Sequence, residues 1–201
     1  MRTRSTIAAA GCVAAVATAV IATAGGDAHQ THRVRAATPA APLVGRWERV
    51  NTCEELVRAL KQYGLAATAP AMLAGNGYVP GTPEEIARRR NPCEGAVARR
   101  HSHFFRADGQ FGSVDFDNNQ VDNGPWRLAN ARTLQIGSPP EAVGTFRIRI
   151  RDGRLRLTPR ITAAQKREAL AHPLEFSSAG WMVAVAFPGH TWQRVPCNEW
   201  C

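Results

Sequence analysis

The chain has 201 residues, 25 basic and 16 acidic side chains, and a formal net charge of +9. This length favours one domain that is large enough to bury a core. The positive charge comes almost entirely from arginine, and no nucleic-acid-binding motif accompanies it, so we expect no nucleic-acid partner.

The N-terminal segment has the pattern of a secretory signal peptide, which we expect over residues 1–26. Arg2 and Arg4 precede an uncharged run rich in Ala and Val, Ile7 to Ala24, that ends in the small residues Ala22-Thr23-Ala24. An uncleaved N-terminal membrane anchor is the alternative, since the run is near the lower length limit for a spanning helix. Residues 27–42 are expected to form a disordered linker, and residues 43–201 the folded domain of a secreted or cell-envelope protein.

The first strand is predicted over Gly45 to Asn51, and a helical insert over residues 52–100 follows it. Thr52 has the character of a helix N-cap, and Gly64 ends the apolar residues at helical spacing. A second short helix is predicted after Thr82, which has proline at the first helical position.

From Arg99 onward the pattern is that of an antiparallel β meander, because turn residues such as Asp108-Gly109 separate short alternating segments. The predicted strands lead to a helix at Thr162–Ala171 and to two last segments, Trp181–Phe187 and Thr191–Val195. We therefore predict a mostly β fold, an up-and-down barrel of eight or nine strands.

Four cysteines follow the predicted signal peptide, and an even number in an exported chain favours two disulfides. An eight-stranded barrel would place the two ends of the insert at one rim and the chain end at the other. This topology pairs Cys53 with Cys93 and Cys197 with Cys201, which is the pairing we favour. A nine-stranded barrel would instead bring Cys197 or Cys201 within reach of Cys53 or Cys93.

Several segments together resemble the lipocalin-like (calycin) β-barrels, in particular short bacterial versions. They are the opening Gly45-Arg46-Trp47, the hairpin Phe105 to Gly112, Asp122 to Leu128, Arg132-Thr133-Leu134 and Thr145 to Thr158. The arginine, alanine and glycine bias is typical of a GC-rich, actinobacterial genome. The resemblance implies that Trp47 packs beneath Arg194 at one barrel end.

The resemblance also implies a barrel cavity that holds a small apolar or amphipathic (lipophilic) ligand. The candidate lining residues are inward residues of the meander: Phe105, Phe111, Trp126, Phe146, Ile148 and Leu157. The alternative is a barrel filled by its own side chains.

A candidate for metal binding or acid–base catalysis lies in two neighbouring strands. His101 and His103 share one strand face, and Asp115 and Asp117 share one face of the next strand. The alternative is a solvated outer strand face. A metal-dependent enzyme is therefore only the third functional hypothesis, and no cofactor is expected.

The most distinctive polar feature is a set of arginines that alternates with apolar residues and must cover one face of adjacent strands. The functional interpretation is an anion-binding surface for an anionic envelope polymer, or an arginine-rich contact of an envelope interaction or inhibitor module. The alternative is a solvated outer wall. The set comprises Arg147, Arg149, Arg151, Arg154, Arg156 and Arg160.

The sequence thus favours an exported, non-catalytic binding protein with a small ligand in its barrel, and the arginine-rich module is the second hypothesis. Nothing in the sequence indicates the oligomeric state.

Overall fold

The structure is a computed structural model that describes residues 42–114, 119–137 and 144–197. The predicted signal peptide, and all of the predicted linker except Pro42, lie outside these residues. No helix within the described ranges combines the length and the apolar character needed to cross a membrane.

Eight antiparallel strands form a closed barrel in chain order, and β8 pairs with β1 to complete it. This confirms the predicted fold and decides for eight strands rather than nine. The strands are β1 (Gly45–Asn51), β2 (Arg99–Phe105), β3 (Gln110–Val114), β4 (Gln120–Asn130), β5 (Thr133–Ile136), β6 (Gly144–Arg151), β7 (Arg154–Pro159) and β8 (Trp192–Val195).

The contact predicted between Trp47 and Arg194 is present and lies where β8 pairs with β1. The two residues are partners in the β1–β8 register, and the Arg194 guanidinium lies 4.6 Å from the centre of the Trp47 ring system. The buried Trp47 indole N–H donates to the Leu43 carbonyl at 2.9 Å. Arg194 also donates to the carbonyls of Val44 and Pro42. These contacts fix the chain entry against the last strand.

The insert after β1 is helical, as predicted. Its helix α1 begins with a capping box between Thr52 and Glu55. The Ala/Gly/Pro-rich stretch after it contains a 3-10 turn and the helix α2, neither of which we predicted. The elements are α1 (Cys53–Gln62), the 3-10 turn Ala66–Thr68, α2 (Ala69–Gly75) and α3 (Pro83–Ala87).

The predicted Cys53–Cys93 disulfide is present and joins the two ends of this insert. Cys197, which follows β8 at the opposite end of the barrel, is also disulfide-bonded. Cys201 lies outside the described residues.

Two helices separate β7 from β8, and one of them corrects a prediction. The helix α4 (Ala163–Ala171) was expected, but Trp181–Phe187 was predicted as a strand and belongs to α5 (Ser178–Ala186) and its C-cap. The run is apolar on all sides, so it has no periodicity that distinguishes strand from helix. The Ser177 side chain caps the helix by accepting the Gly180 N–H, and Phe187 ends it in a left-handed conformation.

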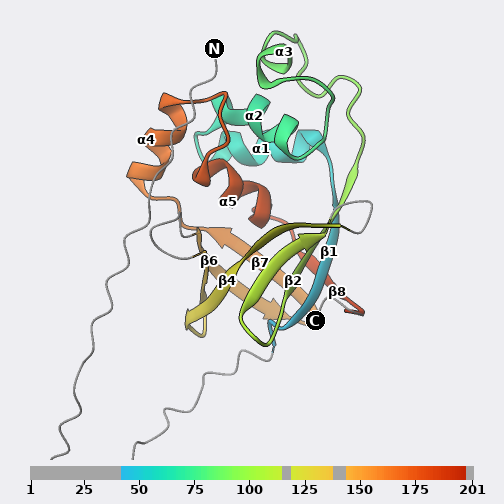
Figure 1. Cartoon of the computed structure of the whole chain (residues 1–201), viewed down its shortest axis with the longest axis vertical. Coiled ribbons are helices and arrows are strands. Elements are labelled where there is room, and N and C mark those ends of the chain that lie inside the picture. Colours follow the sequence, from blue (N-terminus) through green and yellow to red (C-terminus); the bar gives the residue numbers. More distant parts are fainter. Residues whose placement is uncertain (1–41, 115–118, 138–143, 198–201) are drawn as a thin grey trace, which may run out of the picture. The chain divides into compact units, whose positions relative to one another are not determined.

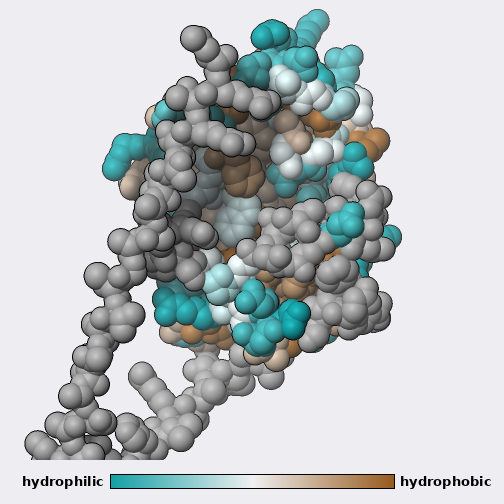
Figure 2. All heavy atoms as spheres, viewed as in Figure 1, coloured by the Kyte–Doolittle hydropathy of each residue, from teal (hydrophilic) through white to brown (hydrophobic). Residues whose placement is uncertain are grey.

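The helices gather at one end of the barrel, where α1, α2 and α5 pack on one another (Figure 1). We call these three helices the helical cap. Hydrophobic atoms are visible at the level of α5, below the hydrophilic side chains of α3 (Figure 2). The opposite end carries the short turns β2–β3, β4–β5 and β6–β7.

Candidate functional site

The arginines predicted to share one face do so on the outer wall of β6 and β7. Exposed arginines alternate along both strands with inward residues such as Phe146 and Leu157, which are fully buried. We call this surface the arginine face and define it as Arg132, Arg147, Arg149, Arg151, Arg154 and Arg156. Arg160, which the sequence also suggested, follows β7 and does not line the pockets described below.

Strand register places like charges directly opposite each other on this face. Arg149 is the cross-strand partner of Arg156, and Arg151 is the partner of Arg154. Like charges in such positions destabilise a sheet. The fold alone therefore does not explain why two adjacent arginine pairs occur here.

Ion pairing offsets little of this repulsion. Arg151 pairs with the neighbouring Asp152 at 3.3 Å, and both side chains are mostly exposed. Within the part of the chain that the structure describes, the other five arginines have no carboxylate at ion-pair distance. The arginine face therefore carries cations whose charges the described carboxylates leave largely uncompensated.

The arginine face is concave. A pocket of about 490 Å³ is lined by Arg132, Arg147, Ile148, Arg149, Arg156 and Thr158. A smaller pocket of about 210 Å³ adjoins it and is lined by Arg149, Arg151, Asp152, Arg154, Arg156 and Thr191. Arg149 and Arg156 belong to both, so the facing pair lies at the centre of the surface.

The predicted set of arginines lacked five residues that line these pockets: Arg132, Ile148, Asp152, Thr158 and Thr191. Arg132 comes from the β4–β5 turn, and its carbonyl accepts the Ile148 N–H at 2.9 Å. This bond brings the turn beside β6. Arg132 lies in a turn, outside the alternating pattern, so strand periodicity gave no signal for it.

The six residues predicted to line a ligand cavity all point into the barrel, where they are buried. Phe105 lies with its ring centre 5.1 Å from that of Phe111 and 5.6 Å from that of Trp126. Phe146 contacts Trp181 of α5 edge to face. Ile148 and Trp126 are 6% and 7% exposed. These aromatic side chains thus pack against one another inside the part of the barrel that the structure describes.

His101 and His103 also point inward, so the interpretation as a solvated outer face is wrong for them. The His103 ring lies 4.4 Å from that of Trp192, and His103 Nδ1 shares a hydrogen bond with Ser113 Oγ at 2.8 Å. The inward face of β2 is therefore polar near the helical cap and aromatic, at Phe105, toward the other end.

The environment of both histidines favours the neutral imidazole. Burial, together with the nearby Arg49 and Arg99, lowers the pKa of His101 to about 4. Burial and the neighbouring His101 lower the pKa of His103 to about 3, although the nearby Val185 carbonyl acts in the opposite direction. Neither side chain is charged at neutral pH.

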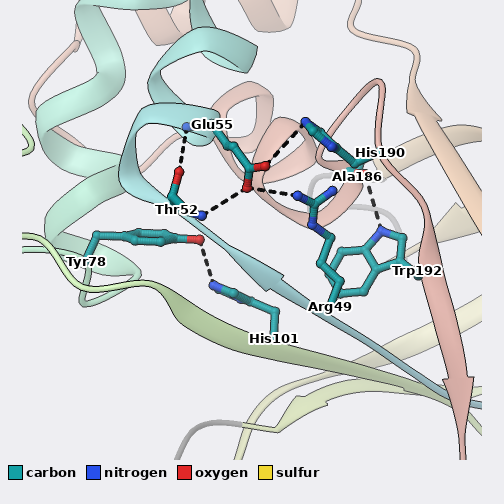
Figure 3. A network of polar contacts seen from close by, with 8 residues as sticks. All are labelled: Arg49, Thr52, Glu55, Tyr78, His101, Ala186, His190 and Trp192. Carbon is teal, nitrogen blue, oxygen red and sulfur yellow. Dashed lines mark hydrogen bonds and ion pairs between the residues drawn. The ribbon is translucent and has the colours of Figure 1, made fainter.

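A polar network that includes His101 joins the helical cap to the barrel (Figure 3). The Tyr78 hydroxyl bonds His101 Nε2 at 2.9 Å, and burial raises the pKa of Tyr78. The Glu55 carboxylate accepts the Thr52 N–H at 3.0 Å and an Arg49 N–H at 2.8 Å, and it lies 3.8 Å from His190 Nε2. The Arg49 guanidinium also lies over the Phe187 ring at 5.5 Å.

The other half of the predicted metal candidate, Asp115 and Asp117, lies outside the described residues. Among the residues that are described, no three His, Cys, Asp or Glu side chains are grouped to hold a metal ion.

No protein-family model matches the chain, and no match is found among curated proteins or solved structures.

Proposed function

We propose that this chain is an exported, non-catalytic binding protein of lipocalin-like type whose arginine face binds an anionic ligand. The observation that carries the proposal is the pocket of about 490 Å³ to which four arginines contribute. Its volume falls in the usual range of small-molecule sites, roughly 300–1,000 Å³.

Guanidinium chemistry supports this ligand class. Arginine presents a planar set of N–H donors that binds carboxylate, phosphate or sulfate oxygens in pairs. An anion between Arg149 and Arg156 would replace their mutual repulsion by two attractions. The repulsion between the two facing arginines, which destabilises the free protein, is thereby relieved when the anion binds.

A ligand inside the barrel stays a prediction, and no described contact favours it over a packed interior. The arginine face therefore supports the binding surface of the second sequence hypothesis rather than the barrel cavity of the first.

A titration with inorganic tripolyphosphate, followed by calorimetry, tests the proposal. We expect binding that weakens steeply as salt rises from about 0.01 to 0.15 M, since salt screens exposed charges. The double variant Arg149→Gln/Arg156→Gln should bind at least about tenfold more weakly, because it removes two charge-assisted contacts and the loss of even one such contact costs about 1.5–3 kcal/mol.

The matched control is Arg58→Gln/Arg167→Gln, which removes the same charge from exposed positions on α1 and α4. It should bind tripolyphosphate almost as the unmodified protein does. Equal weakening in both double variants would show attraction to net charge only and would contradict a site on the arginine face.

A further inference from the structure

We infer that the ligand is a single-chain anionic amphiphile whose head group binds the arginine face and whose apolar chain enters an adjoining pocket at the barrel end. This inference rests on the proposed function and adds the class of molecule that the site selects.

The adjoining pocket, of about 270 Å³, lies at the end of the barrel opposite the helical cap. Its lining combines aliphatic side chains with two cations, namely Pro42, Leu43, Leu128, Ala131, Arg132, Ile148, Arg149 and Ile150. Leu128 and Ile150 are half-buried and pack on the core. We call this pocket the rim pocket. It is an apolar recess with positive charge on one side.

The rim pocket and the larger arginine pocket share part of their lining. Both are lined by Arg132, Ile148 and Arg149. A molecule that places an anionic group on Arg149 therefore has an apolar recess within reach of its next few atoms. Neither pocket alone favours an amphiphile. Because the two pockets share lining residues, one molecule with an anionic head group and an apolar chain can occupy both.

The recess arises because β5 is shorter than the strand beside it. The β5–β6 register ends at Thr133 and Arg147, and the bond from the Ile148 N–H to the Arg132 carbonyl follows it. β6 continues to Arg151, paired with β7 on its other side. The end of β6 thus extends past the β4–β5 turn and leaves a notch in the barrel wall.

The chain entry forms the other wall of the notch, and it is held firmly. The Leu43 carbonyl accepts the Trp47 indole N–H at 2.9 Å, and Leu43 is 1% exposed. Arg194 stacks on Trp47 and donates to the Val44 carbonyl at 3.0 Å. The rim pocket is consequently formed before a ligand arrives, which reduces the entropy lost on binding.

The head group is defined by its charge, so carboxylate, phosphate and sulfate amphiphiles share the required chemistry. A free amphiphile and a lipid within a membrane surface both present it. We commit to the free molecule, because the apolar part of the site is a recess rather than an exposed apolar patch.

The test uses the unmodified protein and a series of alkyl phosphates below their micellar concentrations: methyl, butyl, hexyl and octyl. We expect affinity to rise about fourfold for each methylene that leaves water, until the chain fills the recess. Affinity that does not change with chain length would overturn the inference while the binding of methyl phosphate or tripolyphosphate still supports the proposed function. Absence of binding by every anion would overturn both.

Variants locate the apolar chain. In Ile150→Gln, and in a second variant Leu128→Gln, the gain with chain length should fall at least fivefold while methyl phosphate affinity stays within about twofold. In Arg149→Gln, the affinity of every member of the series should fall. A chain-length gain that survives both rim variants would place the chain elsewhere and contradict the inference.

Sedimentation with vesicles of phosphatidylglycerol and phosphatidylcholine separates the two sources of the head group. We expect octyl phosphate to bind and to prevent any association with vesicles. Binding to vesicles without binding to monomeric octyl phosphate would overturn the commitment to a free amphiphile.

Discussion

The junction beneath the helical cap and the arginine face carry polar side chains in opposite ways. Beneath the cap, Tyr78 meets His101, Arg49 meets Glu55, and the histidines are held neutral by burial. On the arginine face, Arg149 stands opposite Arg156 without a described carboxylate partner. Polar groups that satisfy one another stabilise a fold, whereas like charges left in contact with solvent are available to a ligand.

The largest expected effect concerns the capped end. The double variant Cys53→Ala/Cys93→Ala should lose about 4 kcal/mol of unfolding free energy in the loop-entropy model, because the disulfide closes a loop with a sequence separation of 40. Denaturant unfolding under non-reducing conditions measures the loss. Tripolyphosphate affinity should stay within about twofold, since the arginine face lies outside the insert. A loss of anion binding that parallels the loss of stability would break the distinction between the two regions.

The next effect is a loss of stability in acid. Because the pKa of His103 is about 3 in the folded chain and 6.5 ordinarily, the unfolded chain takes up the proton first as pH falls. The stability that this histidine contributes at neutral pH is therefore lost progressively below about pH 6.5, by roughly 2 kcal/mol at pH 5. His101 should contribute a similar loss in the window from pH 6.5 to about 4.

Urea unfolding at several pH values compares the protein with His103→Gln. The variant should lose about half of the decrease between pH 6.5 and pH 5, whatever its stability at neutral pH. An unchanged pH dependence would show that His103 takes up its proton at the same pH in the folded chain as in the unfolded chain.

The smallest effect has the opposite sign. The variant Arg149→Gln/Arg156→Gln should be more stable than the unmodified protein at low salt, by up to about 1 kcal/mol, because a facing pair of like charges is removed. Thermal unfolding measures the gain, which should shrink as salt rises. Lower stability in the variant would indicate that the facing arginines stabilise the sheet. It would contradict the proposed difference between the arginine face and the paired polar groups beneath the helical cap.

Much of the fold follows from local patterns that agree with one another. The turn at Asp108-Gly109, the cap at Thr52 and the alternation along β6 each specify one structure, and together they predict the barrel and its insert. The prediction of a strand over Trp181 to Phe187 was wrong because a wholly apolar run has no periodicity that distinguishes a strand from a helix. The helix α2 was not predicted, for a related reason: its alanines and glycine resemble the composition of a loop.

The candidate site was predictable only in part. The alternation that places Arg147, Arg149 and Arg156 on one face is visible in the chain itself. Their pocket also needs Arg132, and the rim pocket needs Leu43 from the chain entry. Such combinations depend on register and on the unequal lengths of β5 and β6, which no local pattern specifies. The inward direction of His101 and His103 was likewise missed, since His-x-His fits either face of a strand.

The most direct test of the central proposal is a nuclear magnetic resonance titration with octyl phosphate at pH 6.5 that compares the outside of the barrel with its interior. The account predicts shifts in the side-chain N–H signals of Arg132, Arg147, Arg149 and Arg156, while the indole signals of Trp126 and Trp192 remain unchanged. Shifts confined to those indoles, with the arginine signals unchanged, would place the ligand inside the barrel and contradict the arginine face as the binding site.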